Sequence, residues 1–198
     1  MSLDFNLIEK NIQHGIQRLE ASEVICPGLL SITDLLLPEL LLKLQNYIFN
    51  EKLDWGIQEH HTGVGYHYDR KKINWIPESV IEETHTVLNG LTDCIDQRFN
   101  RKNKFLGLSI WKDEQSYQVP PHTDNPVIDI SMQIYLNGNK DMDLGTKFQI
   151  DKIVGIPYET NCGYLMDNRQ NIVHFYNGKP PKDYYRYSLY AIWINENK

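Results

Sequence analysis

His122 and Asp124 stand two positions apart in the segment PPHTDNP. On an extended segment, side chains two positions apart lie on the same face, so this imidazole and this carboxylate can reach one point. Such a pair begins a mixed nitrogen and oxygen metal site, which suits Fe(II), Mn(II) or Zn(II) better than a metal that seeks thiolates. Taken alone, the tripeptide is more simply a solvated turn with a histidine next to an aspartate.

Two further groups follow in an order that favours the metal site. His174 lies fifty residues beyond that carboxylate, at the end of the apolar run in NIVHFYNG. Arg186 comes twelve residues later and shares one strand face with Ser188, so the two offer a bidentate fork and a hydroxyl to a carboxylate. A buried arginine without an anion would be costly. The alternative is an arginine at a strand end that pairs with a local acid, Asp167 or Asp183.

The first half of the chain predicts two helices. One begins at Pro38, a residue that suits the first helical position, and the other begins with a capping box formed by Ser79 and Glu82. Each helix carries one apolar stripe, and the stripes comprise Leu40, Leu41, Leu44, Tyr47 and Ile48, and Val80, Ile81, Thr84, Val87, Leu88, Leu91, Cys94 and Ile95. Both stripes predict packing against a sheet.

From about Phe105 the apolar period changes to two, which predicts strands in FLGLSIW, DISMQIYL and RYSLYAIWI. In the middle strand, Ile130, Met132, Ile134 and Leu136 point one way, and Asp129, Ser131, Gln133 and Tyr135 point the other. The predicted order is a helical N-terminal part and then an all-β part. Neither a strand–helix alternation nor a glycine-rich phosphate loop is present, which argues against a Rossmann or parallel-barrel fold.

These residues together resemble the Fe(II)/2-oxoglutarate-dependent dioxygenases, and within them the prolyl-hydroxylase-like branch. The resemblance extends from about Leu106 to Ile194, roughly half of the chain. It rests on HTDNP from His122, ISMQIYLN ending at Asn137, LGTKF from Leu144, CGYLMD from Cys162, then His174 and RYS from Arg186. Its specificity lies in the ordered set H-x-D, H and R-x-S. The segment PGLL to NYI looks like the helix that precedes this domain in relatives.

The resemblance implies a mainly β fold with N-terminal helices, namely a double-stranded β-helix or cupin-like jelly-roll barrel. It implies that His122, Asp124 and His174 form a facial triad for Fe(II), which leaves open metal positions. Two of those positions would take the keto-acid end of 2-oxoglutarate, and one would take O2. Because Asp124 is intact, no site is vacant for halide and a halogenase is not expected.

The resemblance also implies that Arg186 and Ser188 hold the distal carboxylate of 2-oxoglutarate. Tyr135 matches a position that often donates its phenol to the same carboxylate. Its polar neighbours make that face look solvated, so Tyr135 either faces the ligand pocket or is a surface phenol. Trp111 stands where relatives often have a tyrosine and a glycine-rich turn, which puts a cosubstrate contact from there in doubt. The family's GG-x-T-x-F signature is reduced to LGTKF at Leu144, which should alter only a turn.

Length, charge and cysteine content limit the class of protein. The 198 residues and 23.3 kDa predict one domain, with a helical support and substrate-loop region over 1–104 and a jelly-roll catalytic core over 105–198. A net charge of -6 argues against a nucleic-acid partner. The three scattered cysteines argue against a disulfide framework or a zinc–cysteine cluster. No signal peptide and no membrane-spanning run are recognised, which predicts a cytoplasmic protein without a membrane partner.

Three functions remain open from the sequence. The first is a hydroxylase that uses 2-oxoglutarate and O2, with ascorbate as a candidate reductant, on a prolyl or other residue of a peptide. The second is the same chemistry on a small metabolite, and the third is a non-catalytic β-helix domain that binds a metal or ligand. The intact triad and Arg186 favour the first two over the third. The segment from Trp55 to Trp75, rich in aromatic and charged residues, is a candidate substrate loop, and the oligomeric state is not indicated.

Overall fold

The computed structural model describes residues 3–50, 53, 55–62, 66–73 and 79–196, and of residues 57–62 and 66–73 it describes the backbone alone. The helices are α1 (Phe5–Glu20), α2 (Pro38–Ile48), α3 (Ser79–Gly90), α4 (Thr92–Phe99) and the short 3₁₀ turn η1 (Asn168–Gln170). The strands are β1 (Glu23–Cys26), β2 (Leu29–Thr33), β3 (Trp55–Thr62), β4 (Tyr66–Ile73), β5 (Asn103–Asp113), β6 (Val119–His122), β7 (Ile130–Tyr135), β8 (Lys147–Gln149), β9 (Ile153–Gly155), β10 (Cys162–Asp167), β11 (Val173–Tyr176) and β12 (Arg186–Asn195).

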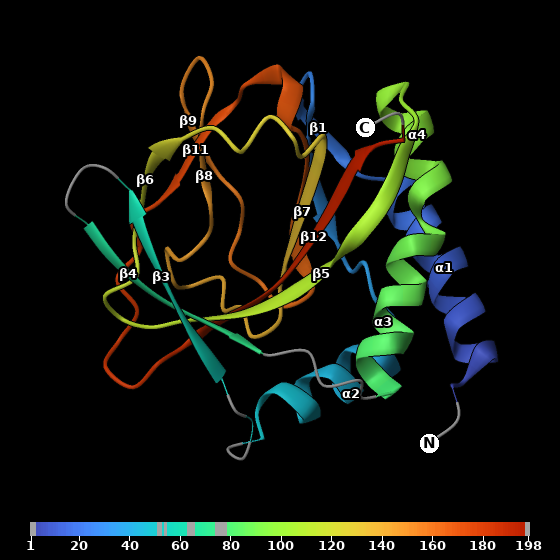
Figure 1. Cartoon of the computed structure of the whole chain (residues 1–198), viewed down its shortest axis with the longest axis horizontal. Coiled ribbons are helices and arrows are strands. Elements are labelled where there is room, and N and C mark those ends of the chain that lie inside the picture. Colours follow the sequence, from blue (N-terminus) through green and yellow to red (C-terminus); the bar gives the residue numbers. More distant parts are fainter. Residues whose placement is uncertain (1–2, 51–52, 54, 63–65, 74–78, 197–198) are drawn as a thin grey trace.

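Two antiparallel sheets form the frame of the molecule (Figure 1). The larger has the strand order β1-β2-β10-β7-β12-β5-β4-β3, and the smaller has the order β6-β11-β8-β9. The three strands predicted from the period of two correspond to β5, β7 and β12, which lie next to one another in the larger sheet. The protein is therefore mostly β with a few helices, as predicted.

The helices cover one face of the larger sheet (Figure 1). Their apolar stripes and the apolar face of β7 form one buried cluster, in which Ile130, Met132 and Ile134 are fully buried. Burial of each such side chain contributes about 1.5–3 kcal/mol. The predicted helix starts at Pro38 and Ser79 are confirmed, and so is the packing of both stripes on the sheet. The second stripe does not lie on one helix as predicted, since α3 ends at Gly90 and α4 begins at Thr92.

The smaller sheet packs against the opposite face of the larger one, and a second apolar cluster fills the space between them. Phe148 of β8 meets Tyr164 of β10 edge to face, with ring centroids 4.9 Å apart. Tyr135 of β7 belongs to the same cluster and is 0% exposed. The polar face of β7 is thus buried between the sheets, and Tyr135 is not a surface phenol.

The N-terminal part is less purely helical than predicted, since β1 to β4 all join the larger sheet. Helix α1 was not predicted, because two positions of its buried face are polar or small. Asn11 is fully buried, donates to the Leu7 carbonyl at 2.9 Å and accepts from the Leu37 amide at 2.9 Å. At Gly15 a Cβ atom would lie 2.9 Å from a terminal methyl group of Leu91, so helix α1 passes close to this side chain.

The predicted substrate segment forms the antiparallel hairpin of β3 and β4, whose β4 pairs with the end of β5. Its side chains beyond Gly56, and residues 63–65 and 74–78, lie outside the described residues. None of the helices in the described ranges combines the length and the apolar character needed to cross a membrane.

Candidate metal and cosubstrate site

Strand pairing in the smaller sheet brings the two predicted histidines together. His122 ends β6, and its register partner in β11 is His174, so the two rings lie on neighbouring strands with centroids 4.3 Å apart. Asp124 follows β6 by two residues, and its Oδ1 lies 3.7 Å from Nε2 of His122 and 3.4 Å from Nε2 of His174. One ligand atom from each residue falls within 4.8 Å of the others. This grouping fits a single metal ion.

Neighbouring groups orient the three candidate ligands. Nδ1 of His122 lies 3.0 Å from the Pro120 carbonyl, and Nδ1 of His174 lies 3.3 Å from the Ile172 carbonyl. A carbonyl oxygen only accepts, so Nδ1 carries the proton in each neutral ring and Nε2 keeps its lone pair for a metal. The phenol of Tyr190 donates to Oδ2 of Asp124 at 3.3 Å.

The electrostatics of the cluster keep the Asp124 carboxylate ionised and favour a proton on the His122 ring. Burial raises the pKa of Asp124, but the hydrogen bonds and charges of the two histidines outweigh it and hold that pKa well below its usual range. Burial lowers the pKa of His122, but its interactions with Asp124 and with backbone carbonyls leave that pKa above the ordinary value. The carboxylate is therefore ionised wherever the histidines are neutral, which is the state that coordinates a metal.

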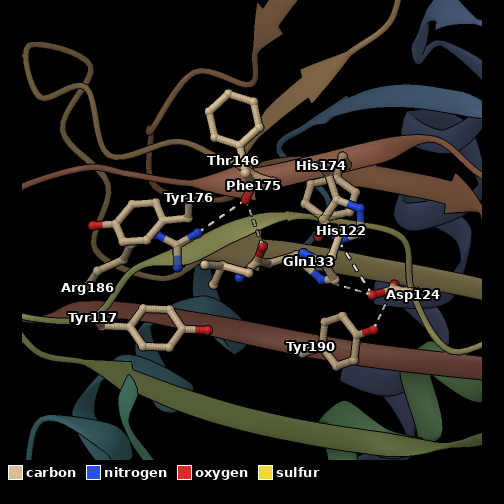
Figure 2. A pocket seen from close by; sticks show the side chains of 12 residues that line it. Tyr117, His122, Asp124, Gln133, Thr146, His174, Phe175, Tyr176, Arg186 and Tyr190 are labelled. Atoms are coloured by element: carbon tan, nitrogen blue, oxygen red, sulfur yellow. Dashed lines mark hydrogen bonds and ion pairs between the residues drawn. The ribbon is translucent and has the colours of Figure 1, made fainter. Parts of the chain in front are cut away.

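A cavity of about 90 Å³ lies beside the triad. Figure 2 shows the triad at one end of the group of lining side chains and Arg186 at the other. The lining residues are Tyr117, Val119, His122, Asp124, Gln133, Thr146, Tyr164, His174, Phe175, Tyr176, Arg186 and Tyr190. The cavity thus connects the candidate metal ligands with the predicted carboxylate receptor.

Arg186 begins β12 and is 2% exposed. Its Nη1 donates to Asp113, which is 0% exposed and is the register partner of Arg186 at the end of β5. The alternative prediction, that Arg186 pairs with Asp167 or Asp183, is wrong about the partner, which is Asp113. Asp167 lies instead at 3.5 Å from Arg101 and 3.2 Å from Arg169.

Aromatic rings and a hydroxyl hold the guanidinium of Arg186 in place. Its central carbon lies 5.0 Å from the ring centroid of Tyr135 and 4.4 Å from that of Tyr176, and Nη2 lies 3.3 Å from Oγ1 of Thr146. Burial lowers the pKa of this group, but Asp113 and the nearby phenols outweigh that effect and leave it above the ordinary value. Arg186 is therefore a fixed, permanently charged donor.

Ser188 and Tyr135 support the cavity wall and are not among the residues that line it. Ser188 is fully buried and accepts from Nε2 of Gln133 at 2.9 Å. The phenol of Tyr135 donates to Oγ1 of Thr146 at 3.2 Å and accepts from the Thr146 amide at 2.7 Å. Oγ1 of Thr146 donates in turn to Oε1 of Gln133 at 3.0 Å. Direct contact of Ser188 and Tyr135 with a cosubstrate stays a prediction.

Several residues of the site were not predicted. Asp113, Gln133 and Thr146 come from three different strands or turns, and their roles depend on strand pairing. A signal existed for two of them, because Gln133 shares the predicted polar face of β7, and the threonine of LGTKF matches the family signature. Tyr176 lies in the apolar run NIVHFYNG and Tyr190 in the predicted strand RYSLYAIWI, and neither was predicted to have a role in the site.

No protein-family model and no curated protein matches the sequence of this chain. Similar proteins are found by comparison of structures. A prolyl-4-hydroxylase from Pseudomonas putida superposes with a TM-score of 0.69 at 13% identity, over 92% of this chain and 99% of that chain. A prolyl hydroxylase from Trichoplax adhaerens superposes with a TM-score of 0.64 at 14% identity, over 99% of this chain and 96% of that chain. That protein is in complex with a peptide fragment of the oxygen degradation domain of hypoxia inducible factor. The chain has the fold of the 2-oxoglutarate/Fe(II) oxygenases.

Other solved members of this fold hold metal and cosubstrate. HygX from Streptomyces hygroscopicus, with nickel, 2-oxoglutarate and hygromycin B bound, superposes with a TM-score of 0.62 at 10% identity, over 86% of this chain and 84% of that chain. The resemblance found in the sequence is thus confirmed at the level of the fold. The chemistry of this chain rests on its own site residues.

Proposed function

We propose that the protein is an Fe(II)- and 2-oxoglutarate-dependent oxygenase that hydroxylates its substrate and releases succinate and CO2. One observation carries the proposal, namely a single cavity with a His–Asp–His cluster at one end and a buried arginine at the other. In this proposal the two sheets are the walls of a double-stranded β-helix. Residues 105–198 supply its core, and residues 1–104 support it and carry the substrate hairpin.

His122, Asp124 and His174 would hold the Fe(II) ion. Their donor set of two imidazole nitrogens and one carboxylate oxygen suits a non-haem ferrous centre with open positions. The backbone carbonyls behind both rings, and Tyr190 behind the carboxylate, fix the directions of the three ligands. Such supporting contacts commonly account for a 10–100-fold difference in metal affinity.

Arg186 would anchor the distal carboxylate of 2-oxoglutarate. Its Nε atom and the hydroxyl of Tyr176 are both buried and have no hydrogen-bond partner among the described atoms. Burial raises the pKa of the Tyr176 phenol above its usual range, although Arg186 opposes this, so the hydroxyl keeps its proton and donates. Two unsatisfied donors beside one cavity are costly unless a ligand accepts from them. Ser188 and Tyr135 would act through Gln133 and Thr146, which they hold against the cavity.

When bound, Fe(II) and the 2-oxo acid would together supply the activation of O2, with two electrons coming from oxidative decarboxylation of the 2-oxo acid. The side chains of the protein would position the reacting groups and exclude water from them. Tyr164, Phe175 and Tyr176 present buried aromatic surface to the cavity, which keeps water from the reacting groups. Positioning governs the rate, since a misplacement of about 1 Å can cost on the order of 10²-fold.

The substrate would approach the triad end of the cavity and be either a prolyl residue in a peptide or a small molecule. Both classes occur among the solved structures of this fold, one of which is in complex with a peptide fragment and another of which has hygromycin B bound. The hairpin of β3 and β4 is the proposed recognition element. Prolyl peptides and small-molecule mixtures can be screened separately for faster succinate release.

The test is succinate release from 2-oxoglutarate in the presence of Fe(II), ascorbate and O2. The wild-type protein is expected to bind one metal ion and to release succinate slowly even before its substrate is known. His122→Ala should lose both properties. His14→Ala, which removes a half-buried histidine bonded to the Asp34 carbonyl, is the matched control and should lose neither. A wild-type protein that binds metal yet neither binds nor decarboxylates 2-oxoglutarate would favour a non-catalytic ligand-binding domain instead.

A further inference from the structure

Asn137 ends the motif ISMQIYLN and follows the last residues of β7. The described pairing of β7 with β12 starts at Ser188, so it does not include Arg186, the first residue of β12. One backbone bond continues a step further, since the Leu136 amide donates to the Tyr187 carbonyl at 2.9 Å. Arg186 therefore lies just beyond the backbone ladder that joins β7 to β12.

The side chain of Asn137 continues this ladder in place of a strand backbone. Its Oδ1 accepts from the Tyr187 amide at 2.9 Å, and its Nδ2 donates to the Tyr185 carbonyl at 2.6 Å. In an antiparallel sheet the backbone groups of alternate residues point to the same neighbouring strand, so these two groups face the side on which β7 lies. Asn137 thus bonds the backbone on both sides of Arg186.

The orientation of the Asn137 amide follows from its partners. The Tyr187 amide only donates and the Tyr185 carbonyl only accepts, so Oδ1 faces the first group and Nδ2 faces the second. The phenol of Tyr158 also donates to Oδ1, at 2.8 Å, and the phenol of Tyr184 donates to the Asn137 backbone carbonyl at 2.7 Å. Burial raises the pKa of the Tyr158 phenol far above its usual range, so this donor keeps its proton. These contacts hold Asn137 in one orientation.

The place of the Arg186 guanidinium depends on this part of the backbone. Its central carbon lies 5.0 Å from the ring centroid of Tyr135 and 4.4 Å from that of Tyr176. The ring of Tyr135 packs edge to face on that of Tyr158, with centroids 5.1 Å apart. The end of a strand frays when its backbone groups lose their partners. Without Asn137 the start of β12 would fray, and a ligand would have to order the guanidinium as it binds.

We propose that Asn137 is a positioning residue, which holds the start of β12 so that Arg186 is already in place to meet the distal carboxylate of 2-oxoglutarate. This inference rests on the proposed function and deepens it, because it names what keeps the anchor ordered. Asn137 is not among the described residues that line the cavity, so it acts through Arg186. An anchor that is ordered in advance spares the cosubstrate the cost of ordering it.

Calorimetry with the Mn(II)-loaded protein, without O2, measures 2-oxoglutarate binding independently of turnover. For Asn137→Ala we expect the affinity for 2-oxoglutarate to fall about 5–30-fold, roughly 1–2 kcal/mol, which corresponds to the cost of fixing the backbone of one residue. Mn(II) affinity should not change, because His122 and His174 are held by their own pairing in the smaller sheet.

Asn11→Ala is the matched control. Asn11 is fully buried in helix α1, and its amide also accepts from one backbone amide and donates to one backbone carbonyl, both at 2.9 Å. This variant should lose stability and keep both affinities.

A double-mutant cycle separates a role that acts through Arg186 from general destabilisation. Arg186→Lys lacks the planar fork whose position Asn137 is proposed to set. In that background Asn137→Ala should therefore weaken 2-oxoglutarate binding by less than about threefold further, so that the two losses are not additive.

An unchanged 2-oxoglutarate affinity in a folded Asn137→Ala protein, an equal loss in Asn11→Ala, or additive losses in the cycle would overturn the inference and leave the proposed function standing. If Asn137→Ala does not fold, Tyr158→Phe decides, since it removes one donor to Oδ1 of Asn137. A loss of 2-oxoglutarate affinity of at least about threefold with unchanged Mn(II) affinity supports the inference, and a smaller loss overturns it. A Mn(II)-loaded wild type that binds no 2-oxoglutarate overturns both.

Discussion

Replacing Arg186 with lysine separates the charge of the anchor from its shape. Lysine keeps a positive group opposite Asp113, so the buried acid is not left unpaired, but it loses the planar edge formed by Nε and Nη2. Two charge-assisted hydrogen bonds to a ligand carboxylate are worth about 1.5–3 kcal/mol each, and a lysine ammonium can restore one of them. The expected loss is about 1.5–3 kcal/mol, which weakens 2-oxoglutarate binding by roughly 10–150-fold.

Calorimetry with the Mn(II)-loaded Arg186→Lys protein measures this loss, and a Mn(II) titration of the same protein checks that metal affinity is retained. Arg169→Lys changes an arginine that pairs with Asp129 and Asp167, and it should leave 2-oxoglutarate affinity unchanged. Arg186→Met should instead lower the free energy of unfolding by about 3–5 kcal/mol, because it breaks the buried ion pair with Asp113. Wild-type affinity for 2-oxoglutarate in a folded Arg186→Lys protein would refute the assignment of Arg186 as the anchor.

Three further outcomes follow from the site and its surroundings. Tyr190→Phe removes the donor to Asp124 and should weaken Mn(II) binding about 10–100-fold, and an unchanged titration would contradict that role. A proton and a metal compete for the His122 ring, whose pKa is raised. As the pH is lowered from 8, metal affinity should therefore begin to fall before the pH reaches ~6.5. A metal competition titration that stays flat from pH 8 to 6.5 would count against this prediction. Gly145→Ala would place a Cβ atom 1.8 Å from the Ile156 carbonyl oxygen, so the free energy of unfolding in a urea titration should drop by about 1–3 kcal/mol, whereas Gly155→Ala, with its nearest atom at 4.0 Å, should cost less.

The sequence alone predicted those parts of the fold that depend on local periodicity. The alternation in β7 assigned its two faces correctly, because successive side chains of a strand must point to opposite sides. The stripes after Pro38 and Ser79 predicted helices for the same kind of reason, with a period of 3.6. Helix α1 escaped prediction because Asn11 and Gly15 occupy its buried face, and their fit depends on the Leu37 amide and on Leu91.

The residues of the candidate triad could also be predicted from the sequence, because their spacing and order are local properties of the chain. His122 and Asp124 are held close by two residues of backbone, and the order in which His174 and Arg186 follow is a property of the chain itself. The meeting of His174 with His122 required more, since the register of β11 on β6 sets it. Spacing along the chain restricts which residues can meet, but antiparallel pairing selects which of them do meet.

The partner of Arg186 was decided by tertiary structure alone. Asp113 lies 73 residues earlier in the chain, and only the register of β5 on β12 places its carboxylate against the guanidinium. The burial of Tyr135 was settled in the same way, because the smaller sheet covers a face that is polar in sequence. The sequence by itself determined which residues could do chemistry and which face of each strand they occupy. Long-range strand pairing determined which charges meet in the buried interior, where the low dielectric strengthens an ion pair formed between distant segments.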